Sequence, residues 1–215
     1  MNTCYAVIGT PRSGSSALAG VMHSLGINMG PSLMNGMEHN IKGFYEDIEF
    51  LGFHQFMYGE IPNLSMNNLD DYTMECTQPK YTNLIRTRCV QEKWGLKDPR
   101  LVFVLKNFSE YLMNCKLKIV STVRPINLSA KSMSKLLKVD YRKASEIIGR
   151  YEIARLDTLQ WAGENNIETL VVPYNDLVDK TEDIISSLAK FCDIDDELTI
   201  QQARYMVDPG LRNNR

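Results

Sequence analysis

The chain has 215 residues, of which 44% are hydrophobic and 23% are charged, proportions typical of a globular protein with a sizeable core. Its formal net charge of −2 gives no electrostatic reason to expect nucleic acid as a partner. No apolar run approaches the length of a membrane span, no signal peptide is apparent, and the 5 cysteines include no C-x-x-C pair. We therefore expect a cytoplasmic protein with a single domain over residues 1–215, and neither a disulfide framework nor a zinc site.

The first predicted elements surround a loop bounded by glycines. An apolar run, Tyr5–Ile8, leads into the loop Gly9–Ser16. Helical spacing follows at Leu18, Val21, Met22 and Leu25. A strand, a loop and a helix N-terminus together form an anion site, because the loop N–H groups point inward and the helix adds partial positive charge. The two glycines have the spacing of the nucleotide phosphate loop, G-x-x-x-x-G-K-[ST], but Ser15 stands where that pattern has lysine, and Arg12 supplies a cation inside the loop.

The next segments predict two helices separated by a polar stretch. After several turn formers between residues 28 and 43, a half-buried helix is expected to begin at Phe44–Asp47. Residues 60–79 are polar and rich in asparagine, and they predict a loop that covers a site. A helix is expected from Tyr81 to Gln91.

A second informative segment follows a short strand that is predicted to end at Lys97. Asp98 is a suitable N-cap, and Pro99 suits the first position of a helix. We expect Asp98 and Arg100 to hold this turn through capping and a salt bridge.

The second half of the chain alternates predicted strands and helices. Residues 117–123 are the best candidate for a central strand, which ends at Arg124, and a helix that carries Ser132 follows. The remaining predicted elements are a helix over 141–165, a strand over 168–173, a turn over 174–177 and a helix around 184–191. Because several strands are short apolar runs between helices, we predict an α/β fold of three layers, a central parallel sheet with helices on both faces, of the P-loop-like nucleotide-binding type. Ligands then bind at the carboxyl ends of the strands.

Several of these segments together resemble the sulfotransferases that use 3′-phosphoadenosine 5′-phosphosulfate (PAPS). The loop Gly9–Ser16, GTPRSGSS, resembles the 5′-phosphosulfate loop of that family. Arg124, with Ser132 eight positions later, resembles its 3′-phosphate motif. Lys42–Asp47 (KGFYED) and Leu96–Arg100 (LKDPR) resemble motifs of its bacterial and protein-tyrosine branches. The matches span nearly the whole chain in the expected order.

The resemblance implies that the protein moves a sulfuryl group from PAPS to a hydroxyl or amine by direct in-line transfer, without a metal, leaving adenosine 3′,5′-bisphosphate. It also implies that Arg124 and Ser132 bind the 3′-phosphate. The loop residues implied to hold the 5′ end are Pro11, Arg12, Ser13, Gly14, Ser15 and Ser16. The chemistry agrees, because PAPS is anionic at two separated places and needs two anion sites. A fixed cation, Arg12, is also wanted where the bridging oxygen gains charge.

The acceptor hydroxyl needs a general base near the reacting sulfate. Resemblance to the protein-tyrosine branch implies Glu46 as this base and Lys97 beside the sulfate. Because the cytosolic branch uses a histidine, His39 and His54 remain alternatives to Glu46. A small-molecule or carbohydrate acceptor is expected, while the acceptor itself and the oligomeric state stay open.

Two other functions share the predicted fold and loop. A P-loop nucleotide kinase or other triphosphatase would need a lysine where Ser15 stands and an acid that holds Mg²⁺. A non-catalytic member of the fold would bind nucleotide through Arg124 and Ser132 and make no use of Glu46.

Overall fold

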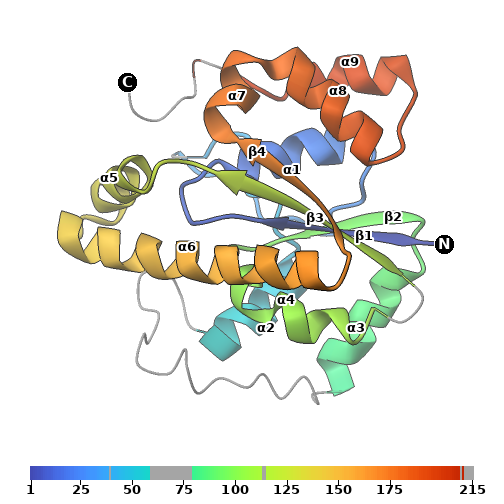
Figure 1. Ribbon diagram of the computed structural model, residues 1–215, viewed down its shortest axis with the longest axis horizontal. Coiled ribbons are helices and arrows are strands. Elements are labelled where there is room, and N and C mark those ends of the chain that lie inside the picture. The colour runs from blue at the N-terminus through green and yellow to red at the C-terminus, as the bar shows by residue number, and fades with distance from the viewer. Residues whose placement is uncertain (39, 59–78, 113–114, 209, 211–215) are drawn as a thin grey trace.

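Four parallel strands form one sheet in the computed structural model, which describes residues 1–38, 40–58, 79–112, 115–208 and 210 (Figure 1). The sheet order is β2–β1–β3–β4. The strands are β1 (Thr3–Ile8), β2 (Lys93–Lys97), β3 (Lys116–Val123) and β4 (Glu168–Pro173). The helices are α1 (Ser15–Ser24), α2 (Ile48–Tyr58), α3 (Pro79–Cys89), α4 (Leu101–Ser109), α5 (Ile126–Leu137), α6 (Tyr141–Glu164), α7 (Tyr174–Asp179), α8 (Thr181–Phe191) and α9 (Glu197–Arg204). None of these helices is long and apolar enough to cross a membrane.

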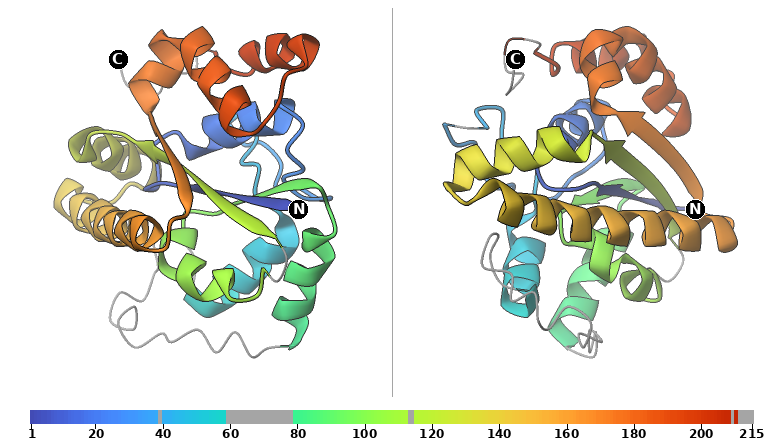
Figure 2. Two further views of the ribbon diagram at one scale, coloured as in Figure 1. Left: turned by 45° about the vertical axis from the view of Figure 1, so that its right-hand side comes forward. Right: turned by 60° about the vertical axis from the view of Figure 1, so that its left-hand side comes forward.

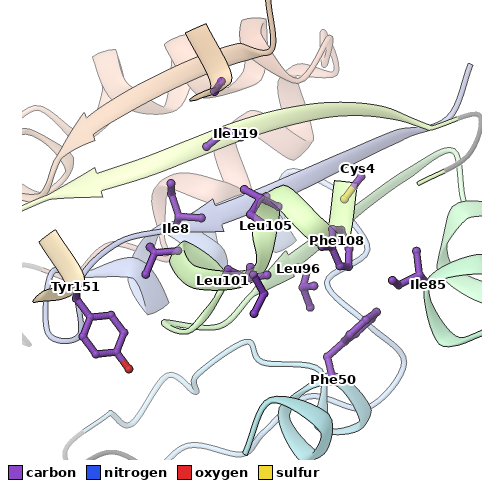
Figure 3. Close-up of a cluster of buried hydrophobic side chains, with 14 of the residues drawn as sticks. Cys4, Ile8, Phe50, Ile85, Leu96, Leu101, Leu105, Phe108, Ile119 and Tyr151 are labelled. Carbon is purple, nitrogen blue, oxygen red and sulfur yellow. The ribbon is translucent and has the colours of Figure 1, made fainter. Parts of the chain in front are cut away.

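Helices cover both faces of the sheet, as the predicted three-layer α/β fold requires (Figures 1 and 2). Side chains of β1 alternate between two cores, because successive residues of a strand point to opposite faces. Cys4, Ala6 and Ile8 join the core under α2 to α6, part of which Figure 3 shows. Tyr5 and Val7 join the core under α1, α7, α8 and α9. With both faces buried, the strands read as nearly continuous apolar runs, which is how the parallel sheet was predicted.

Two helices begin later than the sequence predicted. The helix expected at Phe44 begins only at Ile48, because Asp47 bridges to Leu33 and its carboxylate accepts the N–H of Glu49. The helix expected at Pro99 begins at Leu101, after a turn in which the Asp98 carboxylate accepts the N–H of Arg100.

The segment predicted as a turn at 174–177 is the helix α7, and α9 was not predicted at all. The predicted covering loop over 60–79 lies outside the described residues except at its last position, which begins α3.

The strand order creates a crevice beside the first loop. β1 and β3 are neighbours, but the helix that follows β1 packs on one face of the sheet and the helices that follow β3 pack on the other. Such a reversal is where parallel α/β sheets bind ligands. The loop after Ile8 and the residue after Val123, Arg124, therefore lie side by side at the carboxyl edge.

Close packing explains the two glycines of the first loop. A Cβ at Gly9 would lie 2.7 Å from both Ser13 Oγ and Thr122 Oγ1, which themselves share a 2.6 Å hydrogen bond. Gly14 has φ +93°, and a Cβ there would lie 2.1 Å from the Tyr174 ring. The glycine spacing is therefore a steric requirement of the loop at both ends.

Replacing Gly14 tests this requirement. In Gly14→Ala we expect the free energy of unfolding to fall by roughly 1–3 kcal/mol, because alanine is strained at this φ and the Tyr174 ring must move. Gly149→Ala is the matched control: a Cβ at Gly149 in α6 meets no atom within 4 Å, so stability should rise by about 0.5–1 kcal/mol. Urea unfolding measures both. Equal stability of Gly14→Ala and the parent chain would contradict the steric account.

Candidate active site

A cavity of about 720 Å³ opens at the carboxyl edge of the sheet. It is lined by the first loop, by the segment before α2, by the residues after β2, β3 and β4, and by the segment after α9. Six of the predicted site residues lie on the first loop or just after β3 and line it, namely Pro11, Arg12, Gly14, Ser15, Ser16 and Arg124. Glu46 and Lys97 line it too. Eight of the ten predicted site residues thus share one cavity.

Two guanidinium groups meet beside the first loop. Arg124 donates a 3.1 Å hydrogen bond to the carbonyl oxygen of Arg12 and stacks over the Tyr174 ring at 4.9 Å. Burial and the nearby charge of Arg124 lower the pKa of Arg12. Among the described residues no carboxylate lies within ion-pair distance of Arg12. Two close cations at a helix N-terminus favour an anionic ligand.

The other two predicted site residues have side chains directed elsewhere. Ser13 is fully buried, and its hydroxyl bonds Thr122 at the end of β3. Ser132 accepts a 3.1 Å hydrogen bond from Arg12 Nε. Neither side chain lines the cavity. Ser132 therefore contributes to the cavity indirectly, because it helps to fix the side chain of Arg12, which lines the cavity.

A buried ion pair lines the cavity beside the first loop. Lys97, at the end of β2, donates to Glu46 Oε1 at 2.5 Å and to Ser16 Oγ at 3.2 Å. Both charged side chains are almost completely buried. Among the described residues, Lys97 forms no ion pair with the neighbouring Asp98. The ammonium instead links the carboxylate of Glu46 to α1.

Burial raises the pKa of the Glu46 carboxyl, and the neighbouring charge of Asp98 adds to the rise. The charge and hydrogen bond of Lys97, together with Arg100, oppose it. The carboxylate is therefore more basic than an exposed glutamate while still held in a fixed orientation. A raised pKa and a fixed orientation are properties that a carboxylate needs to accept a proton.

His54 lies in a separate buried network. Its Nδ1 is 3.0 Å from Asp98 Oδ2 and its Nε2 is 2.9 Å from the Tyr81 hydroxyl. Asp98 also accepts two 2.8 Å bonds from Arg100, as the sequence predicted. Burial alone would raise the pKa of Asp98, but the interactions with His54 and Arg100 lower it to about 2. Both ring nitrogens of His54 are engaged and the residue does not line the cavity, whereas His39 lies outside the described residues.

Two residues with left-handed backbone conformations lie at the cavity. Five described residues other than glycine have positive φ. Three of them, Lys138, Asn166 and Asp193, follow the ends of helices, where this conformation is common. The other two, Arg12 and Tyr45, both line the cavity. Strain of this kind concentrates at functional sites.

Several residues that line the cavity were not predicted from the sequence. Tyr174 follows β4 directly, so its place at the carboxyl edge could have been inferred from the predicted strand. Met206 and Val207 follow the unpredicted α9, and no pattern in the sequence pointed to them.

Several solved structures resemble the chain in three dimensions. The sulfotransferase domain of the Synechococcus PCC 7002 olefin synthase superposes with a TM-score of 0.60 at 18% identity, over 100% of this chain and 83% of that one. The fold is that of sulfotransferase domains. The sulfotransferase STF1 from Mycobacterium tuberculosis H37Rv gives a TM-score of 0.55 at 15% identity, over 95% and 71% of the two chains. The sulfotransferase domain from the curacin biosynthetic pathway gives 0.51 at 17%, over 94% and 78%. No protein-family model matches the chain, and no curated protein matches it in sequence.

Removal of one partner tests the buried ion pair. In Lys97→Met the free energy of unfolding should fall by about 3–5 kcal/mol at neutral pH, because the Glu46 carboxylate is left buried without a cation. The Glu46→Met/Lys97→Met double variant should recover most of this loss. Lys116→Met, which breaks the exposed pair with Glu168, is the control and should cost less than about 1 kcal/mol.

The pH dependence of the Lys97→Met variant has a defined sign. Without Lys97 the pKa of Glu46 rises further, so the folded state binds a proton that the unfolded state has released. Stability should therefore fall as pH rises from the ordinary pKa of glutamate toward the raised one. Urea unfolding across this pH range measures the effect, and stability that does not change with pH would contradict it.

Proposed function

We propose that the protein transfers a sulfuryl group from PAPS to a hydroxyl or amine acceptor. The observation that carries this proposal is the position of Lys97, whose ammonium contacts both Glu46 and Ser16. It joins a candidate general base to a phosphate-type loop within one cavity. A reaction in which an acceptor loses its proton beside an anionic donor needs this arrangement. A cytoplasmic location, expected from the scattered cysteines, belongs to the same proposal.

The residues of the cavity fit PAPS in charge and size. A volume of about 720 Å³ is within the range usual for sites that enclose small ligands. Arg12 and Arg124 supply two guanidinium groups, each able to hold a phosphate oxygen pair. The N–H groups at the start of α1 lack intrahelical acceptors and can bind further anionic oxygens. When bound, PAPS supplies a sulfuryl group attached to a phosphate that departs.

Each charged side chain then has a separate task. Glu46 accepts the proton of the acceptor hydroxyl. Lys97 keeps Glu46 in place and adds positive charge beside the first loop. Arg12, fixed by Ser132, stabilises charge on the departing phosphate. Arg124 holds a second anionic group at the end of β3.

The rival functions are less consistent with the same geometry. A kinase-type loop needs a lysine where Ser15 stands. A lysine does reach the loop, but it comes from β2, and its ammonium is paired with Glu46. A non-catalytic nucleotide-binding protein would have no use for a buried pair that is costly to desolvate and that faces the cavity.

Nucleotide titration tests the donor site. Calorimetry should show that adenosine 3′,5′-bisphosphate binds more tightly than Mg-ATP. Arg124→Ala should lower the affinity for the bisphosphate by at least about tenfold, because hydrogen bonds to a charged phosphate are lost. Arg86→Ala is the matched control, since Arg86 is exposed on α3 and does not line the cavity. Preference for Mg-ATP, or equal affinity in both variants, would count against the proposal.

Conversion of the carboxylate to an amide tests the base. Glu46→Gln should lower turnover with labelled PAPS and a panel of alcohols, phenols and sugars by about a hundredfold or more, while affinity for adenosine 3′,5′-bisphosphate stays the same. Glu49→Gln, a substitution of an exposed acid three residues away, should leave turnover unchanged. If Glu46→Gln keeps full turnover, another residue is the base.

A further inference from the structure

One side of the cavity is apolar and continues to the molecular surface. Its side chains come from the segment before α2 and the second turn of α2: Met34, Met37, Ile41, Phe44 and Leu51, which we call the apolar wall. Met37 is 49% exposed and Ile41 is 68% exposed, so the wall is apolar at the mouth of the cavity as well as inside. Large apolar side chains that remain exposed around an opening mark a binding surface.

Two polar side chains beside this wall, Asn40 and Lys42, are bonded within the protein. Asn40 Nδ2 donates to the Gly43 carbonyl at 2.7 Å. Lys42 Nζ donates to the carbonyl oxygens of Tyr205 and Met206 at 3.1 and 3.0 Å. The Lys42 bonds hold the wall against the segment after α9, and both side chains use donors that a polar ligand would need.

The apolar wall adjoins the candidate base. Phe44 is two residues before Glu46, and its ring centre lies 6.0 Å from Lys97 Nζ. Phe44, Glu46 and Lys97 all line the cavity, so a molecule whose hydroxyl reached this pair would have the Phe44 ring close by. From there the wall extends toward Ile41 and the surface.

We infer that the acceptor is a neutral alcohol or phenol with an apolar body, which lies on the apolar wall while its hydroxyl reaches Glu46. This inference rests on the proposed function. Glu46 takes the hydroxyl proton, the acceptor oxygen forms a bond to sulfur, and adenosine 3′,5′-bisphosphate leaves with the electrons of the broken oxygen–sulfur bond. The product is a sulfate ester.

A sugar or an anionic peptide fits this wall less well. A sugar would bury hydroxyls against methionine and isoleucine side chains without hydrogen bonds, which is costly. An anionic acceptor would meet Glu38, which also lines the cavity, while the ammonium of Lys42 is already bonded. Methionine side chains adapt to different apolar shapes, so the wall suits a class of alcohols instead of one compound.

A chain-length series tests the inference. The protein saturated with adenosine 3′,5′-bisphosphate is titrated by calorimetry with primary alcohols from butan-1-ol to octan-1-ol, and with glucose. The dissociation constant should fall by up to about fourfold for each added methylene, the limit for full burial. Glucose should bind more weakly than octan-1-ol. Affinity that is independent of chain length, tighter binding of glucose, or alcohols that bind only in place of the bisphosphate would overturn the inference.

A pair of matched variants locates the effect. Ile41→Asn should lower the affinity for octan-1-ol by about fivefold, because an apolar contact is lost. The affinity for the bisphosphate should not change. Ile153→Asn makes the same substitution at a 63% exposed isoleucine of α6 that does not line the cavity, and it should change neither affinity. Equal octan-1-ol affinity in the two variants would remove the wall as the acceptor site.

The same measurements separate this inference from the function on which it rests. Failure of the bisphosphate to bind would contradict the proposed donor, and with it the sulfuryl transfer in which the alcohol is the acceptor. Tight binding of the bisphosphate together with a flat alcohol series would keep the sulfotransferase proposal and overturn the apolar acceptor.

Discussion

The buried contact between Glu46 and Lys97 constrains the segments around the cavity. Neither charge has access to much solvent, so each depends on the other for compensation, and Lys97 has Ser16 as a further partner. The contact ties together three segments that are distant in the sequence: the loop before α2, the end of β2 and the start of α1. If the loop moved away with Glu46, Lys97 would be left as an unpaired charge in a nearly dry site. The cost of that unpaired charge holds the segment before α2 against the first loop.

The parallel sheet brings the remaining groups to the same edge. Each strand runs in the same direction, so the residues that follow Ile8, Lys97, Val123 and Pro173 lie along one line. The first loop, Arg124 and Tyr174 meet there, and the Tyr174 ring packs on Gly14 and beneath Arg124. Their side-chain contacts are made possible by the glycines of the loop, which leave room for a ring and for two hydroxyls.

Local sequence patterns predicted the strand ends, and the family resemblance picked out the site residues that lie at them. The first loop, Lys97 and Arg124 each follow an apolar run, and a parallel sheet places such residues together. Contacts over long sequence separations could not be predicted in this way. The bond between Arg12 and Ser132 spans 120 residues, and nothing in either segment indicated it.

The error at Phe44 has a similar origin. Its helical pattern is real, but Tyr45 takes a left-handed conformation and Asp47 forms a bridge to Leu33, both of which depend on tertiary packing. His54 is a further case. It was an alternative base by type of residue, and only the fold shows that Asp98 and Tyr81 occupy its two ring nitrogens.

The backbone of Arg12 has a consequence for how such a loop can change during evolution. At φ 68° an arginine is strained by roughly 1–3 kcal/mol, whereas glycine would adopt the same conformation freely. Selection for thermal stability alone would therefore favour replacing the cation, and the anion binding that we propose for this loop would oppose it. On that proposal, stability and activity trade off directly at this position. A library of variants at this position that is screened only for resistance to heat should accumulate glycine and lose the Arg12 cation from the cavity.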